Sequence, residues 1–141
     1  MVSIACCLAA CGSTAGDAEQ EIRAWLDSGQ QAAEEKDRRT LVSMISPDYA
    51  DRQGNDRAAI EKLLIYYFLR QNNITLLTRV EDLQVFDNTA AEVRMTVGMA
   101  GSDASALGFS AEAYRFLLEL ERDDDDWLLV AARWARLNED L

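Results

Sequence analysis

The stretch from Tyr114 to Leu137 constrains the fold more than any other part of the chain. Its first half alternates between two sets of residues, Tyr114, Phe116, Leu118 and Leu120 against Arg115, Glu119 and Glu121. A period of two is typical of a strand with one buried face. Four aspartates at 123–126 interrupt the pattern, and a second apolar run starts at Trp127. Two such runs around a short polar turn predict an antiparallel β-hairpin.

The length of the turn decides which residues of this hairpin share a face. An even-numbered turn places Leu120 opposite Leu129 and Phe116 opposite Arg133, so that the arginine lies on an otherwise apolar face. An odd-numbered turn brings Trp134 to that face and directs Arg133 into water, because a slip of one residue exchanges the two faces. We expect the even-numbered register, with Arg133 inside and Trp134 outside.

Length and composition limit the classes of function. The chain has 141 residues, 49% hydrophobic and 28% charged, which is ordinary for one folded domain with a single core. A net charge of -11 argues against nucleic acid as a partner, since phosphate binding needs clustered Lys and Arg. The absence of histidine removes the commonest general base and transition-metal ligand. We expect no metal site and no cofactor.

The N-terminal segment carries a targeting pattern. Residues 2–10 are small and apolar, and Leu8-Ala9-Ala10 directly precedes Cys11. This order resembles the lipobox of bacterial lipoproteins, in which an aliphatic residue and two small residues precede the cysteine. The resemblance implies a diacylglycerol thioether on Cys11, with residues 1–10 as the signal segment and 11–17 as the lipidated cysteine and tether. No Lys or Arg precedes the apolar run, which departs from the usual signal pattern.

Several expectations follow from the lipoprotein resemblance. Cys6 and Cys7 would leave with the signal and Cys11 would carry lipid, so the folded domain would have no disulfide. Gly12 after the cysteine implies the outer membrane, facing the periplasm, in a Gram-negative host. No run of 18 or more apolar residues is present to span a bilayer. The alternative is an ordinary buried N-terminal segment with three reduced cysteines.

Helical periodicity dominates the first half of the chain. An amphipathic pattern predicts a helix over 17–36, with Asp17 as its N-cap, and Asp37 is placed to cap a second short helix. Ser46-Pro47 ends that helix, because the residue before proline avoids the helical region. A third helix is predicted from Asn55 or Asp56 to Arg70. Its apolar stripe is Ile60, Leu63, Leu64, Tyr67 and Phe68. We expect Leu64→Ala to be among the most damaging substitutions, because its burial contributes roughly 1.5–3 kcal/mol.

Strand periodicity replaces the helical pattern after residue 73. The alternation over 74–85 changes phase near Glu81-Asp82, which indicates a β-bulge. A turn is predicted at 87–89 and a second strand over 93–99. Residues 101–111 read as a loop of small residues before the hairpin. The expected architecture is therefore α+β, with three N-terminal helices packed on a curved, mostly antiparallel four-stranded sheet.

This order of elements resembles the nuclear transport factor 2-like, or SnoaL-like, superfamily. The likeness rests also on Ser46-Pro47-Asp48-Tyr49, on Gly54-Asn55-Asp56 before the third helix, and on Trp127-Leu128-Leu129 after the acidic turn. It covers residues 18–138 of one domain over 18–141. In that superfamily the sheet wraps the helices into a cone whose open end holds a small apolar ligand.

The resemblance implies a ligand site around Asp48, Tyr49, Phe116 and Arg133. Superfamily enzymes such as ketosteroid isomerase and scytalone dehydratase use Asp, Tyr or His inside the cone. A buried Asp48 could abstract a proton while Tyr49 donates to the oxyanion. The structural interpretation has more support: Asp48 binds loop amides, Tyr49 is a core ring, and Arg133 pairs with an acid. The arginine would also lower the pKa of a nearby aspartate and weaken it as a base.

Three functions are therefore open. We expect a lipid-anchored envelope protein whose domain binds a small apolar ligand or a protein partner without catalysis. The first alternative is an isomerase- or dehydratase-like enzyme that uses Asp48, Tyr49 and Arg133. The second is a homodimer that forms through an outer sheet patch of Leu117, Leu128, Val130 and Trp134. The aspartates at 123–126 lack the ligand spacing and glycine of an EF-hand loop and are interpreted as a solvated turn.

Overall fold

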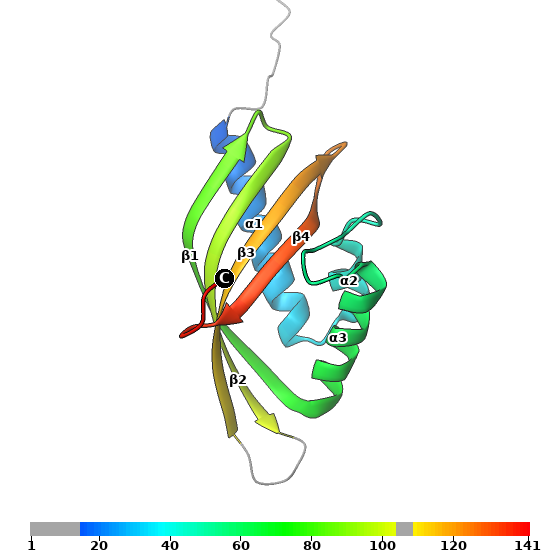
Figure 1. Cartoon of the computed structure of the whole chain (residues 1–141), viewed down its shortest axis with the longest axis vertical. Helices are drawn as coiled ribbons and strands as arrows, with labels where there is room; N and C mark the ends of the chain where they lie inside the picture. Colours follow the sequence, from blue (N-terminus) through cyan, green and yellow to red (C-terminus); the bar gives the residue numbers. More distant parts are fainter. Residues whose placement is uncertain (1–14, 104–108) are drawn as a thin grey trace, which may run out of the picture.

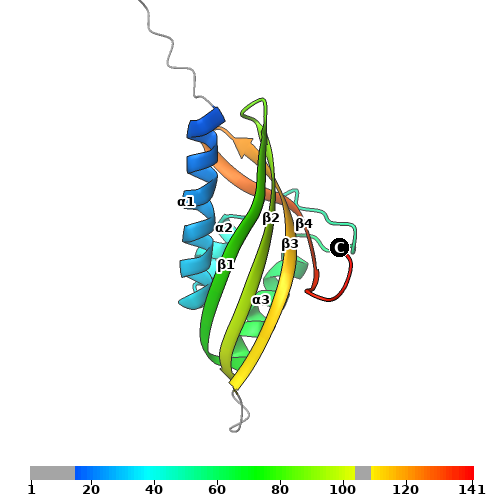
Figure 2. The same cartoon turned by 90° about the vertical axis from the view of Figure 1, so that its left-hand side faces the viewer.

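Three helices precede a four-stranded antiparallel sheet in the computed structural model, which describes residues 15–103 and 109–141. The elements are α1 (Ala15–Glu34), α2 (Arg38–Ser43), α3 (Arg57–Arg70), β1 (Gln71–Phe86), β2 (Ala90–Asp103), β3 (Phe109–Asp123) and β4 (Asp126–Arg136). The strands pair in the order β1-β2-β3-β4. Helix α1 runs along one face of the sheet, and α2 and α3 lie beyond β4 (Figure 1, Figure 2). The predicted α+β architecture is confirmed.

The helix ends follow the predicted capping residues. Asp37 accepts a hydrogen bond from the Thr40 amide at 3.1 Å and caps α2. Asp56 accepts one from the Ala59 amide at 2.8 Å and caps α3. Helix α1 begins at Ala15, inside the segment expected to be a tether, so Asp17 lies in its first turn and not at the cap. The carboxylate still lies near the positive end of the helix dipole.

The strand boundaries depart little from the sequence pattern. The register of β1 against β2 shifts between Val80 and Asp82, which confirms the predicted bulge. The loop predicted over 101–111 is shorter than expected, because β2 continues to Asp103 and β3 begins at Phe109. Residues 104–108 of that loop lie outside the described part of the chain.

The final hairpin has the even-numbered turn but not the expected register throughout. Next to the turn, Leu120 pairs with Leu129, as predicted. The register then shifts, leaving Val130 unpaired between Leu129 and Ala131. A bulge of one residue exchanges the two faces of the strand beyond it.

The bulge at Val130 overturns the predicted position of Arg133. Phe116 pairs with Trp134, and the next residue of β3, Leu117, pairs with Arg133. Phe116 and Trp134 pack against the buried core, so they define the inner face of the sheet. Arg133 therefore lies on the outer face, and the expected pairing of Phe116 with Arg133 is wrong.

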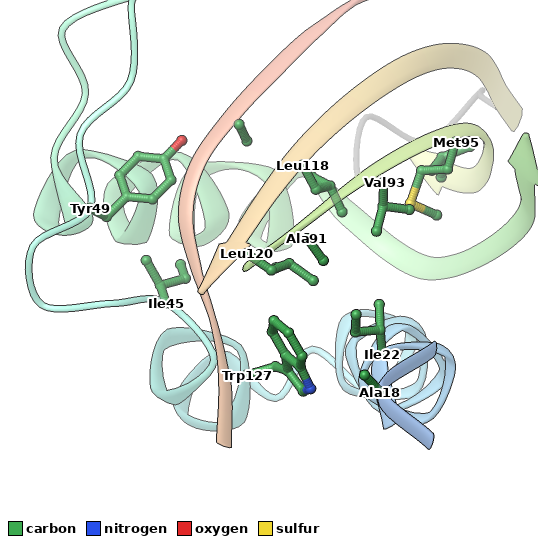
Figure 3. Packing of buried hydrophobic residues seen from close by; sticks show 12 residues of the cluster. Ala18, Ile22, Ile45, Tyr49, Ala91, Val93, Met95, Leu118, Leu120 and Trp127 are labelled. Carbon is green, nitrogen blue, oxygen red and sulfur yellow. The ribbon is translucent and has the colours of Figure 1, made fainter. Parts of the chain in front are cut away.

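The centre of the core lies between α1 and the inner face of β2 and β3. Ile22 of α1, Val93 of β2 and Leu120 of β3 are 0%, 0% and 1% exposed. Trp127 of β4 lies on the same side and packs toward α1 (Figure 3). Complete burial of these side chains makes the α1 side the chief source of hydrophobic stabilisation.

A polar cluster fixes α1 to the hairpins. The Glu21 carboxylate pairs with the Arg122 guanidinium at 2.8 Å and accepts a hydrogen bond from the Trp127 indole at 3.0 Å. The guanidinium of Arg122 lies 4.6 Å from the centre of the Trp127 ring, and its Nε donates to the carbonyl of Asn88 at 2.8 Å. These contacts join one helix to two separate turns of the sheet.

Helix α3 is packed far less completely than α1. None of its residues is buried, and Leu63, Tyr66 and Leu69 are 46%, 60% and 76% exposed. Leu64 is only half-buried. The expectation that Leu64→Ala is among the most damaging changes is not supported, since the Leu64 side chain is not fully buried.

Candidate functional site

Three aromatic side chains form a row on the inner face of β3 and β4. We call Tyr114, Phe116 and Trp134 the aromatic row. The ring centres of Tyr114 and Phe116 are 6.4 Å apart, and those of Phe116 and Trp134 are 6.4 Å apart with a stacked interplanar angle of 28°. All three side chains are half-buried. Their faces and edges therefore keep surface that another apolar group can cover.

Helix α3 supplies two further aromatic side chains. The rings of Tyr67 and Phe68 lie 6.4 Å apart, and both are half-buried. Burial raises the pKa of the Tyr67 hydroxyl, and the charges of Glu112 and Tyr114 raise it further. Ile60 of α3 packs against the same buried core cluster as Phe116 and Trp134. Helix α3 and the aromatic row therefore lie on the same side of the sheet.

The end of the row carries polar groups. The Tyr114 hydroxyl donates to the Glu112 carboxylate at 2.8 Å and accepts a hydrogen bond from Arg136. Burial raises the pKa of Tyr114, and the bond to Glu112 raises it further. A hollow of about 490 Å³ adjoins this pair, lined by 112–113 and 136–138. Its volume is within the roughly 300–1,000 Å³ of ligand pockets.

The aromatic row has the side chains that apolar and aromatic molecules contact. Rings of Tyr, Phe and Trp offer stacking and edge contacts to apolar and aromatic molecules. The Glu112, Tyr114 and Arg136 groups at its end can orient a polar substituent. Within residues 15–103 and 109–141, no group of three or more His, Cys, Asp or Glu is placed to hold a metal ion. No helix in this part of the chain is long and apolar enough to cross a membrane.

The loop residues predicted for the site lie elsewhere. Asp48 is exposed, and Tyr49 is 2% exposed at the edge of the core beside β4. The Tyr49 hydroxyl donates to the Asp51 carboxylate at 2.9 Å. Burial raises the pKa of Tyr49 well above its usual range, and the bond to Asp51 and its charge raise it further. This hydroxyl is therefore a structural hydrogen-bond donor.

Arg133 lies on the outer face of the sheet, beside the loop. It lines a second hollow on the outer face of β3 and β4 together with the loop residues 50–52. The structure thus brings Arg133 close to the loop that contains Tyr49, but leaves Phe116 on the inner face and Asp48 in solvent. A ligand role for these four residues stays a prediction, and they do not share one pocket.

The sequence pattern missed Trp134 and Tyr67 as site residues. The sequence predicts Trp134 on the outer face, because the bulge at Val130 has no signature in the apolar run from 127 to 137. The predicted outer patch for a homodimer therefore loses Trp134, and its Leu117 is only 4% exposed. Association through the remaining residues, Leu128 and Val130, stays a prediction, as does lipidation of Cys11, which lies outside the described residues.

Comparison with known proteins identifies the fold. No protein-family model matches the sequence, and a comparison with curated proteins finds no match. Solved structures do match. A candidate dehydratase of the nuclear transport factor 2-like family from Streptomyces avermitilis superposes with a TM-score of 0.77 at 13% identity, over 89% of this chain and 100% of its own.

Two further structures give the same result. A candidate scytalone dehydratase from Novosphingobium aromaticivorans has a TM-score of 0.74 at 11% identity, over 86% of this chain and 89% of its own. A ketosteroid isomerase-like protein from Erwinia carotovora has a TM-score of 0.70 at 11% identity, over 85% and 96%. Likeness at such low identity concerns the fold alone. The chain therefore adopts the nuclear transport factor 2-like, or SnoaL-like, fold.

Proposed function

We propose that this domain binds a small aromatic or apolar ligand between α3 and the aromatic row, without catalysing a reaction. One observation carries the proposal: aromatic side chains of α3 and of the aromatic row remain half-buried, while Ile22, Val93 and Leu120 on the α1 side of the same sheet are at most 1% exposed. Tyr67 stands on one side, and Phe116 and Trp134 on the other. A ligand that covers these rings would complete the packing.

The energetic argument rests on apolar area. An aromatic side chain can bury 150–250 Å² when fully covered, and each Å² removed from water contributes roughly 25 cal/mol. Rings that are half-buried in the free protein still expose apolar area, and burial of that area by a ligand would contribute to the free energy of binding. The hollow of about 490 Å³ lined by 112–113 and 136–138 lies next to the polar end of the row, where a polar substituent of the ligand would reach it.

The enzymatic alternative has less support. It needs Asp48, Tyr49 and Arg133 in one pocket, but Asp48 is exposed and the Tyr49 hydroxyl is bonded to Asp51. Arg133 lines a hollow on the opposite face of the sheet from the aromatic row. The candidate dehydratases and the isomerase-like protein share the fold, and a shared fold hosts many unrelated chemistries.

A neutral fluorescent probe tests the binding proposal. N-phenyl-1-naphthylamine brightens in apolar surroundings and carries no charge that the acidic protein would repel. We expect saturable binding to the purified domain, and we expect Phe116→Ala to weaken it roughly ten-fold because an aromatic contact is lost. The matched control is Leu77→Ala, which removes a side chain that is 76% exposed.

Two results would count against the proposal. The first is no saturable increase in fluorescence with the unaltered domain. The second is an equal loss of affinity in the Phe116 and Leu77 variants, which would indicate binding to general apolar surface. Circular dichroism of each variant separates loss of binding from loss of fold.

We also propose that lipid on Cys11 anchors the domain in the bacterial cell envelope. The support is the order Leu8-Ala9-Ala10-Cys11 followed by Gly12. Metabolic labelling of the full chain with radioactive palmitate tests it. We expect label on the unaltered chain and on Cys7→Ser, and none on Cys11→Ser. Equal labelling of both variants, or no labelling of the unaltered chain, contradicts the anchor.

A further inference from the structure

A second hollow lies on the outer face of the sheet, away from the aromatic row. Loop residues 50–52 stand beside β3 and β4 and enclose about 240 Å³ together with Leu117, Glu119 and residues 131–133. The Ala50 amide donates to the carbonyl of Val130, the bulge residue, at 3.1 Å. The bulge and the loop are thus joined, and together they form the hollow.

The floor of the hollow is apolar. Leu117 is only 4% exposed although it belongs to the outer face, where its neighbours Arg115 and Glu119 are exposed. The alanines at 131 and 132 add small apolar surface beside it. The covered Leu117 and the half-buried Ala131 form an apolar floor that a side chain of limited size can contact.

Some charged groups that line the hollow are already hydrogen-bonded within the protein, and others are not. The Asp51 carboxylate accepts hydrogen bonds from the Tyr49 hydroxyl, the Gln53 amide and the Asn55 amide, each at 2.9 Å, and from the Asn55 side chain at 3.0 Å. Its oxygens are therefore already engaged. In the part of the chain that the structure describes, Arg52 and Arg133 form no ion pair with any carboxylate.

Glu119 completes the set of charges. It is exposed, lines the same hollow, and forms no ion pair with a described residue. The hollow thus offers two guanidinium groups and one carboxylate that have no partner in the described chain. Guanidinium groups bind carboxylates through two parallel hydrogen bonds, and a carboxylate binds an ammonium group.

We propose that this hollow binds a small zwitterion with an apolar side chain, of the class of free α-amino acids. The ligand carboxylate lies on Arg133 with Arg52 beside it, its ammonium group lies on Glu119, and its side chain contacts the floor formed by Leu117 and Ala131. A zwitterion suits an acidic protein better than a simple anion, because the net charge of -11 repels anions. The site is separate from the aromatic row and does not depend on it.

Calorimetric titration with three related compounds tests this site. L-leucine carries both charges, L-leucinamide lacks the carboxylate, and N-acetyl-L-leucine lacks the ammonium group. We expect L-leucine to bind, and each of the other two to bind at least about ten-fold more weakly, since each loses a charged hydrogen bond. Equal binding of all three compounds, or no binding of L-leucine at millimolar concentration, overturns the proposal.

Variants locate the binding. Arg133→Gln is expected to weaken L-leucine binding at least about ten-fold. Arg115→Gln is the matched control, because Arg115 is exposed on the same face but does not line the hollow. Equal effects of the two variants overturn the proposal. L-leucine should also leave binding of N-phenyl-1-naphthylamine unchanged, so failure at one site is distinguishable from failure at the other.

Discussion

Helices α1 and α3 serve the same sheet in different ways. On the α1 side, Ile22 and Leu120 are 0% and 1% exposed. On the α3 side, no helix residue is buried, and the aromatic row that faces it is half-buried. The α1 side therefore holds the fold together, and the α3 side keeps apolar surface for a ligand. The two sides thus differ in how much apolar burial contributes to the free energy of unfolding, and this difference can be measured.

The largest effect should come from Leu120→Ala. The substitution leaves a cavity in the most tightly packed part of the core, so we expect a loss of roughly 2–5 kcal/mol in the free energy of unfolding. Unfolding in urea, followed by circular dichroism, measures it. A loss below about 1 kcal/mol would mean that the α1 side is not the main source of stability.

Leu64→Ala is the matched substitution on the α3 side. Leu64 is half-buried, so the same chemical change should cost about 1 kcal/mol, at most about half of the effect at Leu120. The same urea titration gives the comparison directly. Equal losses at the two leucines would remove the distinction between the two sides.

The sequence predicted the type of each element because the periodicities are strong. The amphipathic pattern of α1, the capping residues Asp37 and Asp56 and the bulge near Glu81 all appear in local patterns. Local pattern does not report how closely a helix approaches the sheet, so the open packing of α3 was not predictable.

The candidate site could be predicted only in part, for a second physical reason. Phe116 follows from the alternation in β3, whereas the inner position of Trp134 depends on one unpaired residue, Val130. A bulge of one residue moves every later side chain to the other face. The same bulge explains why the prediction for Arg133 is wrong: it places Arg133 on the outer face, where the residue lines the second hollow.

Polar contacts sharpen the contrast between the helices. Glu21 joins α1 to Arg122 and Trp127. Because the pair is partly exposed, we expect Glu21→Gln to cost about 1 kcal/mol or less. The control is Glu19→Gln on the same helix, whose ion pair with Arg23 is more exposed and should contribute only about 0.3–0.5 kcal/mol. A larger loss at Glu19 would contradict the anchoring role of Glu21.

The smallest effect concerns the loop beside β4. Burial raises the pKa of Asp51, but hydrogen bonds from Asn55, Tyr49 and Gln53 outweigh it and bring the pKa below 3.8. The pKa of Asp51 is lower in the folded state than in the unfolded state. The ionised carboxylate therefore stabilises the fold fully at pH values above the unfolded-state pKa. This contribution is lost as the pH falls through the folded-state pKa.

Thermal unfolding of Asp51→Asn across acidic pH checks this contribution. The variant should have a lower Tm than the unaltered protein at neutral pH, and the difference should disappear in strong acid. A difference in Tm that is constant with pH would mean that the carboxylate charge contributes nothing. The carboxylate is bonded to the loop residues Tyr49, Gln53 and Asn55, so this test concerns the loop and not the packing of α1.

The three tryptophans allow the most direct test of the central claim. Trp25 is on α1, Trp127 pairs with Glu21 on the α1 side, and Trp134 belongs to the aromatic row. In an NMR spectrum of the ¹⁵N-labelled domain, each indole N–H gives its own signal. Titration with N-phenyl-1-naphthylamine should move the Trp134 signal and leave those of Trp25 and Trp127 in place. Movement of the Trp25 or Trp127 signal without that of Trp134 would contradict the account.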